Sequence, residues 1–362
     1  MAVSEADFIQ IFQSEHKADI GMTASNWQTS LLASGATANG TALIVGDSHA
    51  QLAATASTNV VCDLSHLGLL QLDGADAVNF LQGQVSNDVK LLLGSNAHYT
   101  AYCNPKGRML ALFLAFSHHD HLHLQINRDL LAPVMKRLNM YVMRSKVEIK
   151  DVSSTIVKLG LNGPQAASLL VPLFTKIPTQ NFELVSLDNG TILKLPSLLG
   201  MARFEIFVDV SSAAIIFAAL KENCQLVEKP CWDWLEIQMG IPEITLTTQE
   251  QFVPQMLNLD ILNAINFKKG CYTGQEIIAR THYLGSVKRR TYLAEMASEA
   301  SPGDKVLDAT QSEVGQIVRA VPNLTGSFDV LAELRIDAAA AGTLSCNGAA
   351  LAFKTLPYSL ET

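Results

Sequence analysis

The order of predicted elements in residues 147–228 restricts the fold of this chain more than any other feature of its sequence. Apolar runs of strand length alternate there with helical segments, in the order strand, helix, strand, strand, helix. This order is typical of a ferredoxin-like unit. We therefore predict the α+β class for this part of the chain. The predicted segments are residues 156–161, 165–170, 191–195, 204–210 and 211–223.

The pattern changes after Arg290, where short strand-like runs are separated by turns at intervals of about ten residues. Such spacing is typical of a small β-barrel or sandwich, and we predict a C-terminal β-barrel over residues 286–362. A chain of 362 residues is also too long for one core, since single cores stop growing near ~250–300 residues. Residues 59–285 form the main predicted region. Residues 1–58 remain an unplaced N-terminal segment, with an amphipathic helix expected over residues 1–20.

Composition excludes several classes of protein. Hydrophobic residues make up 48% of the chain and charged residues 17%, so we expect a packed, ordered protein. The net charge of −8 disfavours a general nucleic-acid binder, which is usually basic. No apolar run reaches the ~18 residues of a membrane span, and no basic segment precedes an apolar one at the N-terminus. The six cysteines lack a Cys-x-x-Cys pair, which indicates reduced thiols. We expect a cytoplasmic location.

A cluster of histidines raises the question of a metal site. His118, His119, His121 and His123 lie within six residues. The alternative is a solvated hairpin turn, and strand alternation predicts that His121 and His123 lie on the outer face. A functional metal site also needs supporting partners around its ligands, so we predict no metal site.

The candidate functional site is residues 268–276, Lys-Lys-Gly-Cys-Tyr-Thr-Gly-Gln-Glu. Cys271 lies between Gly270 and Gly274, and glycine allows positive φ angles and close approach of a ligand. A free thiol titrates near ~8.5, and neighbouring cations favour the thiolate. The alternative is a buried structural cysteine beside a solvated charged face. The surrounding basic residues are Lys268, Lys269, Arg280, His282, Lys288, Arg289 and Arg290.

Residues 267–276 resemble the signature of the YgfZ family, whose members are folate-binding relatives of the glycine cleavage T-protein, an aminomethyltransferase. The resemblance extends from about residue 60 to the C-terminus. It implies a T-protein-like folate-binding core over residues 59–285, with the ferredoxin-like part inside it and the β-barrel after it. The other matching segments are residues 80–88, 240–242, 252–255, 257–259 and 356–360.

The resemblance also implies site residues. Cys271 is expected to be the working thiol and tetrahydrofolate the bound cofactor. Trp232 lies where some family members carry a tryptophan that contacts folate, although a core tryptophan is the alternative. Leu67 stands at a second position where members carry an aromatic residue. The basic residues suit the acidic tail of folate. The expected folate-binding residues are Trp232, Lys269, Gly270, Tyr272, Gly274, Gln275, Glu276 and Arg280.

The sequence departs from the T-protein pattern in its acids. T-proteins carry paired aspartates on the strand after an Asn-x-x-Gly-Gly turn. Here residues 104–108 read Asn-Pro-Lys-Gly-Arg, and the strand continues through Leu110 and Leu112 without a carboxylate. The glutamate that contacts the pterin in T-proteins falls near Met201. Without these acids the proton chemistry of aminomethyl transfer is lost, so we expect no T-protein activity and leave open whether any reaction is catalysed.

Three functions follow as hypotheses. The first is a folate-dependent accessory factor in the assembly or repair of iron–sulfur proteins, which thereby supports tRNA thiolation. Its partners would be iron–sulfur assembly or client proteins, because Cys271 alone cannot supply the about four thiolates of a cluster. The second is a folate-dependent enzyme that transfers one-carbon groups to an unknown acceptor. The third, direct tRNA binding through the basic residues, is disfavoured by the net charge.

Overall fold

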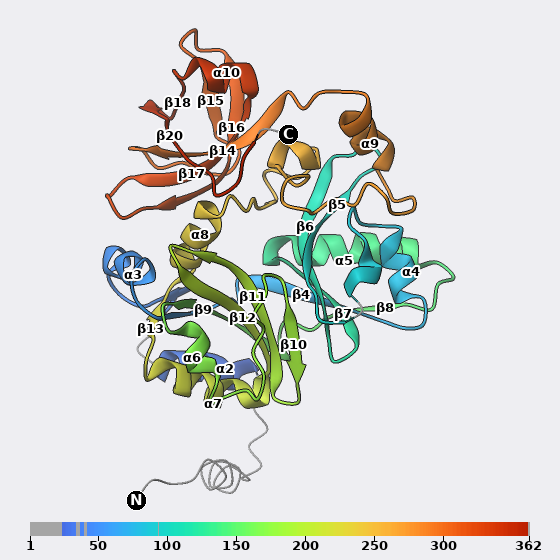
Figure 1. Cartoon of the computed structure of the whole chain (residues 1–362), viewed down its shortest axis with the longest axis vertical. Coiled ribbons are helices and arrows are strands. Elements are labelled where there is room, and N and C mark those ends of the chain that lie inside the picture. The colour runs from blue at the N-terminus through green and yellow to red at the C-terminus, as the bar shows by residue number, and fades with distance from the viewer. Residues whose placement is uncertain (1–23, 34–36, 40–41, 93, 361–362) are drawn as a thin grey trace, which may run out of the picture.

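The computed structural model describes residues 24–33, 37–39, 42–92 and 94–360. Three large sheets and one hairpin of β1 (Thr37–Asn39) and β2 (Ala42–Ile44) contain the strands of this part (Figure 1). None of the helices described combines the length and the apolar character that a membrane span needs. The helix predicted over residues 1–20 lies outside the described residues.

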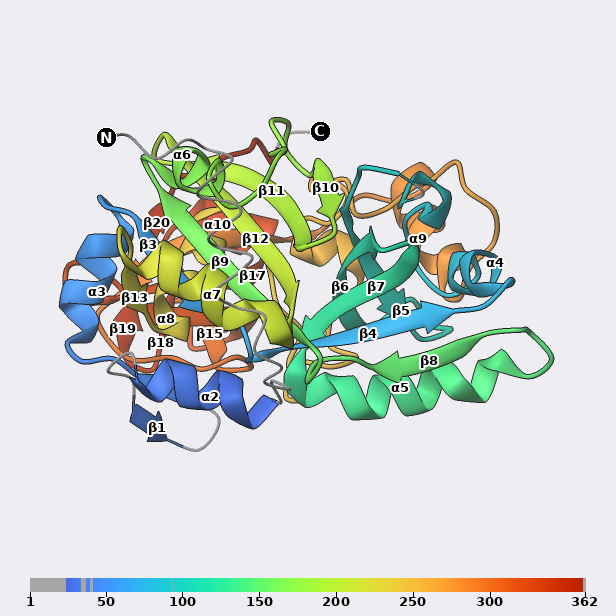
Figure 2. The same ribbon diagram turned by 90° about the horizontal axis from the view of Figure 1, so that it is seen from below.

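The five-stranded sheet is antiparallel and has the order β5, β6, β7, β4, β8. α5 (Arg128–Val142) lies along β4 and β8 (Figure 2). It begins where the Asn127 side chain accepts the backbone N–H of Asp129, which satisfies one of the donors left open at a helix start. The other elements are β4 (Leu67–Asp73), α4 (Ala77–Gln82), η1 (Val89–Leu92), β5 (His98–Cys103), β6 (Met109–His118), β7 (His121–Asn127) and β8 (Glu148–Asp151).

The six-stranded sheet has the order β10, β11, β12, β9, β3, β13. The elements β9, α6, β11, β12 and α7 follow the predicted ferredoxin-like order, which confirms that prediction. Two strands of this sheet were not predicted: β10, between α6 and β11, and β13, after α7. β3 lies between β9 and β13, antiparallel to the first and parallel to the second. The elements are β3 (Val60–Asp63), β9 (Ile156–Gly163), α6 (Ala166–Leu170), β10 (Leu184–Leu187), β11 (Gly190–Leu198), β12 (Met201–Asp209), α7 (Val210–Lys221) and β13 (Gln225–Val227).

Part of the N-terminal segment belongs to this core. α2 (Ala24–Ala33) packs on α7, and the rings of Trp27 and Phe217 meet edge to face with centroids 5.3 Å apart. α3 (Ser48–Thr55) packs on β13 and on α8 (Lys229–Gln238). The structure therefore places residues that the sequence left unplaced. The boundaries predicted at residues 58 and 285 stay predictions.

The third sheet is a nearly closed antiparallel barrel in the order β19, β18, β15, β16, β17, β14, β20. This confirms the C-terminal β-barrel expected from the spacing of its turns. β14 pairs with both β17 and β20, so the last strand returns to the first. The elements of the barrel are β14 (Arg289–Met296), β15 (Lys305–Leu307), β16 (Glu313–Pro322), β17 (Phe328–Arg335), α10 (Ile336–Ala341), β18 (Ser345–Cys346), β19 (Ala349–Ala350) and β20 (Ala352–Lys354). Two helices precede it in the chain, η2 (Pro254–Leu257) and α9 (Gln275–Tyr283), and α9 lies beside β5 (Figure 1).

The prediction that His123 lies on an outer face is wrong. Its side chain is fully buried and stacks on Phe116 of β6, with ring centroids 5.5 Å apart. Phe116 in turn contacts Phe207 of β12, because the five-stranded sheet packs against the six-stranded one. His118 is also buried, with its Nδ1 2.5 Å from the Thr191 hydroxyl. His119 and His121 agree with the predicted solvated turn, since both are exposed. His121 also pairs with Asp73.

α8 joins the barrel to the rest of the protein (Figure 1). Asp329 of β17 is buried and accepts hydrogen bonds from Trp234 Nε1 at 3.1 Å and Gln238 Nε2 at 2.6 Å, both on α8. The same carboxylate accepts from Asn323 and from the Lys354 ammonium group within the barrel. The buried Asp329 carboxylate thus connects α8, the turn at Asn323 and strand β20.

We predict that Asp329→Ala lowers the free energy of unfolding by about 3 kcal/mol or more, because it leaves buried donors and the Lys354 ammonium without an acceptor. Urea denaturation followed by circular dichroism measures the change. Asp337→Ala is the matched control, since Asp337 pairs with Arg335 on the exposed surface. Equal stability of the Asp329 variant and wild type contradicts this assignment.

Candidate functional site

The first candidate site is a cleft between the five-stranded sheet, α8 and the barrel, and Trp232 forms one wall. The Trp232 ring is buried against Gly160, where an added Cβ would lie 2.5 Å from the ring. The Arg203 guanidinium lies 5.1 Å from its ring centroid. Leu67, the position expected on another wall, also lines this cleft. The other lining residues include His66, Tyr99, Leu112, Leu114, Gln125, Asn127, Glu205, Glu236, Glu243 and Arg319.

Two buried ion pairs surround the cleft. Arg203 pairs with Glu236, whose other carboxylate oxygen lies 3.4 Å from the Tyr99 hydroxyl. Arg319 of the barrel pairs with Asp233 of α8 at 2.5 Å. The Asp233 pKa falls well below its usual range despite burial, because Arg319 and Lys229 are close to it. These four charges are compensated within the fold.

Glu205 differs from the other acids of the cleft. Its carboxylate is buried and accepts a hydrogen bond from Gln125 Nε2 at 2.9 Å. Burial, reinforced by the nearby Glu236 charge, raises its pKa to about 7. Gln125 Oε1 has no hydrogen-bond partner among the described residues. Glu205 therefore exchanges a proton near neutral pH, next to an amide oxygen that is free to accept one more hydrogen bond.

Sequence reasoning missed Glu205 as a site residue, although it carried a signal. Glu205 interrupts the apolar strand Met201–Asp209 at a position whose neighbours are buried. Met201 is not among the lining residues of the cleft, whereas Glu205 is. The residues that β6 contributes to the lining are Leu112 and Leu114, and both are apolar. The cleft thus receives its acids from β12, α8 and the residues just after α8, and the lining from β6 brings no carboxylate.

The second candidate site is the loop that carries Cys271. Its thiol is exposed, whereas the other five cysteines are buried. Gly274 begins α9 with a φ of +84°, and an added Cβ there would lie 2.6 Å from the Asn104 backbone oxygen. At Gly270 an added Cβ would meet nothing within 4 Å. The loop is therefore packed tightly on one side of Cys271 and open on the other.

Lys269 is buried and holds this loop in place. Its ammonium group donates to the backbone oxygens of Gln82, Val85 and Asn87 at 2.8, 2.7 and 2.8 Å. Burial lowers its pKa to about 8. All three ammonium hydrogens have partners, so the side chain connects two segments of the chain. Its predicted role in folate binding stays a prediction. The ammonium also lies 5.1 Å from the centroid of the Tyr272 ring, which is buried as well.

The remaining basic residues divide into two groups. Arg289 pairs with Glu333, and Arg290 makes a bidentate pair with Asp260. Arg280 and Lys288, by contrast, are exposed, as is Lys268. Gln275 and Glu276 form the first turn of α9, where an acid is favourable because of the helix dipole. The basic cluster seen in the sequence is therefore only partly available to a ligand.

The predicted site residues lie in two places. Trp232 lines the cleft, whereas none of residues 268–276 does. β5 links the two, because Tyr99 lines the cleft and the turn after Cys103 supports Gly274. In the described part of the chain, no group of three His, Cys, Asp or Glu residues is arranged to hold a metal ion.

Comparisons with known proteins agree with this architecture. The family model described as the GCVT N-terminal domain matches residues 19–266. The tRNA-modifying protein YgfZ of Yersinia pestis strain Pestoides F is 33% identical over 305 residues, which cover 82% of this chain and 92% of the relative. The protein of the same name from Yersinia enterocolitica serotype O:8 matches with the same identity and coverage.

A solved structure shows the same fold. The glycine cleavage system aminomethyltransferase T from Bartonella henselae superposes with a TM-score of 0.73 at 16% identity, covering 91% of this chain and 95% of that one. The fold is thus that of the T-protein class, as the resemblance implied. With the sequence relatives above, the chain belongs to the YgfZ family.

We predict that Lys269→Met lowers the free energy of unfolding by about 2–4 kcal/mol, because three buried backbone oxygens lose their donor. Urea denaturation measures the effect. Lys268→Met is the control, since the neighbouring side chain is exposed. If both variants are as stable as wild type, the structural role of Lys269 is wrong.

Proposed function

We propose that this protein is a folate-binding accessory factor in the assembly or repair of iron–sulfur proteins, acts in the cytoplasm, and thereby supports tRNA modification by thiolation. The observation that carries this proposal is the exposure of Cys271 alone among six cysteines. The YgfZ relatives are called tRNA-modifying proteins, which agrees with the proposed support of tRNA modification. We assign the working thiol to Cys271.

The residues that line the cleft suit the head of tetrahydrofolate in their chemistry, although the cavity of about 70 Å³ would have to widen to admit it. A pterin ring is flat and packs on aromatic side chains, and Trp232 supplies such a wall. The N–H edge of a pterin suits a carboxylate and a free amide oxygen, and Glu205 and Gln125 Oε1 are both buried there. Bound tetrahydrofolate would supply a carrier for one-carbon units. The chain itself positions the ring and shields it from water.

Cys271 is suited to work with a partner. One thiolate supplies one of the about four ligands of an iron–sulfur cluster, so the remaining ligands come from an assembly or client protein. Alternatively, the thiol acts as a redox or acceptor group for that partner. The exposed and half-buried residues around it, Gly270, Gln275, Glu276 and Arg280, would contact the partner or the folate tail. Lys269, Tyr272 and Gly274 would keep the loop in position.

We do not propose general binding of nucleic acid. The net charge of this chain is −8, whereas proteins that bind nucleic acids in general have lysines and arginines clustered over one face. Arg289 and Arg290 are engaged with acids of this chain. The link to tRNA is therefore indirect, through the enzymes that thiolate its bases.

We predict that Cys271→Ser folds as wild type but restores less than a tenth of iron–sulfur enzyme activity and tRNA thiolation in cells that lack the protein, because the thiolate is the required group. Enzyme assays and mass spectrometry of modified nucleosides measure the two outputs. Lys268→Ala, altered at a nearby exposed position, is the control. Full rescue by Cys271→Ser removes the thiol from the proposal.

A second candidate function is a folate-dependent enzyme that transfers one-carbon groups to an unknown acceptor. One observation favours it, the neutral-range pKa of Glu205 inside the cleft, since a general acid or base works best near the operating pH. Normal thiolated tRNA and normal iron–sulfur enzyme activities in cells that lack the protein would favour this candidate over the first.

Glu205 also makes folate binding depend on pH. The ionised carboxylate accepts the pterin N–H groups, and its pKa in the free protein is about 7, raised from the usual value. Affinity for tetrahydrofolate should therefore rise by up to about tenfold per pH unit below 7 and level off above it. Calorimetric titration at steps of about half a pH unit, from roughly pH 5.5 to roughly pH 8, measures this dependence.

The matched variant is Glu205→Gln, which keeps the shape of the side chain and removes its ionisation. We predict a flat pH profile and weaker binding for this variant. Glu250→Gln, altered at an exposed glutamate, should keep the wild-type profile. Parallel profiles for wild type and Glu205→Gln exclude Glu205 from the folate site.

A further inference from the structure

The helix α9 lies at the outer edge of the molecule and exposes large apolar side chains (Figure 1). Every residue of α9 is described, and only Ile278 among them is buried. Ile277, Tyr283 and Leu284, which caps the helix, are 37%, 63% and 85% exposed. Apolar side chains that gather on a surface mark a site of interaction, whereas scattered ones do not. The arrangement of these three residues on the helix therefore decides their meaning.

The apolar side chains gather on one side of the helix. Positions i, i+3, i+4 and i+7 of a helix share a face. Ile277, Arg280 and Leu284 follow the spacing i, i+3, i+7, whereas Glu276, Arg280 and Tyr283 follow i, i+4, i+7. The two stripes share Arg280 and form one surface opposite the buried side. We name this surface the outer face of α9: Glu276, Ile277, Arg280, Tyr283 and Leu284, all of them exposed.

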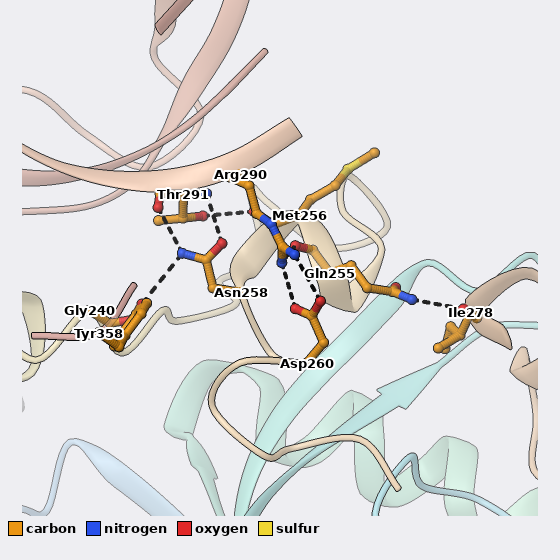
Figure 3. Close-up of polar contacts among 9 residues, drawn as sticks. All are labelled: Gly240, Gln255, Met256, Asn258, Asp260, Ile278, Arg290, Thr291 and Tyr358. Atoms are coloured by element: carbon orange, nitrogen blue, oxygen red, sulfur yellow. Dashed lines mark hydrogen bonds and ion pairs between the residues drawn. The ribbon is translucent and has the colours of Figure 1, made fainter. Parts of the chain in front are cut away.

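The inner side of α9 is fixed to the body of the protein. The Gln255 side chain donates from Nε2 to the Ile278 backbone oxygen at 2.7 Å (Figure 3). The His282 ring stacks on Phe267, with centroids 3.8 Å apart and planes 12° apart. The outer face is therefore presented by a helix that is already ordered, so a partner that docks there does not have to order it first.

Exposed cations surround the outer face. An added Cβ at Gly107 would lie 3.0 Å from the Ile277 Cβ, which places the turn that carries Lys106 beside this face. Glu276 is the only acid in residues 268–288. This surface is therefore positive, although the chain has a net charge of −8, and its complement is an acidic surface. The exposed cations are Lys106, Lys268, Arg280 and Lys288.

The aliphatic side chains between these cations favour a protein over a nucleic acid as the partner. Phosphate groups bind to cations, hydroxyls, amides and backbone N–H groups, and Ile277 and Leu284 supply none of these with their side chains. Protein interfaces instead combine an apolar centre with a polar rim. The outer face of α9 and its surrounding lysines have this composition.

We propose that the outer face of α9 docks an acidic segment of a partner protein. Apolar side chains of that segment cover Ile277, Tyr283 and Leu284, and its carboxylates pair with Arg280 and the neighbouring lysines. Cys271 precedes the helix by four residues, a span of at most about 14 Å, so a partner docked here lies near the thiol. That this partner is an iron–sulfur assembly or client protein rests on the function proposed above.

Photocrosslinking in cells that express the full chain in place of the native protein tests the proposal. Leu284→benzoylphenylalanine puts a photoreactive group on the outer face, and mass spectrometry identifies the captured peptide. We expect a peptide rich in Asp and Glu. Adding Arg280→Glu should lower the yield by about tenfold, because like charges then face each other. Val171→benzoylphenylalanine, at an exposed position after α6, should not capture this peptide.

A charge swap shows whether the contact is specific. Replacing the acids of the captured peptide by Lys, one at a time, should restore most of the yield to Arg280→Glu at one or more positions. Lys176→Glu, at an exposed cation elsewhere, should leave the yield unchanged. The proposal is overturned by absence of capture at position 284, by capture of RNA or of a peptide without acids, or by a yield that Arg280→Glu does not change.

The Cys271→Ser background separates docking from the function proposed above. Docking does not use the thiol, so capture that persists in this background supports the docking surface, whatever the variant does to tRNA thiolation. Absence of capture, while Cys271→Ser still fails to restore thiolation, overturns the docking surface alone. An acidic partner unconnected with iron–sulfur proteins supports the docking surface and contradicts the proposed function.

Discussion

The buried charges of α8 hold this molecule together. Glu236 binds Arg203 of the six-stranded sheet, and Asp233 binds Arg319 of the barrel. Asp233 also pairs with Lys229 of α8 itself, whereas the ion pairs with Arg203 and Arg319 form only when the sheet and the barrel are docked on α8. Removing one member of a buried pair is far more costly than the pair is stabilising. The two pairs therefore specify how the barrel sits on the core. They also define the cleft, since Trp232 projects from the same helix and contacts Arg203.

The site follows from this arrangement. Two charged residues of the cleft lining, Glu236 and Arg319, are paired within the fold. Glu205 also lines the cleft, and burial raises its pKa to about 7. The exposed thiol of Cys271 lies elsewhere, on a loop fixed by Lys269 and Gly274. The cleft of this T-protein-like fold and the exposed Cys271 lie apart, since none of residues 268–276 lines the cleft. β5 joins the two places, because Tyr99 lines the cleft and the turn after Cys103 supports Gly274.

Sequence patterns predicted the elements that depend on local order. The ferredoxin-like path and the barrel follow from the order of the elements and from turn spacing. Contacts between distant segments were not predictable in this way. Alternation cannot show that a second sheet covers His123, and a basic run cannot show that Lys269 bonds three backbone oxygens. The sequence shows Glu205 as an acid in an apolar strand, but the burial of its side chain depends on packing from both sheets.

The position of β3 bears on how the protein is made. β3 is synthesised before the five-stranded sheet, whereas its neighbours β9 and β13 are synthesised after that sheet. During translation, β3 must therefore wait with its edges unpaired while another sheet forms from the chain that follows it. Pairing between such distant segments is slow, and an unpaired apolar strand is prone to aggregate. The nascent chain is thus most vulnerable before β13 emerges, which makes this interval the one in which a chaperone would matter most.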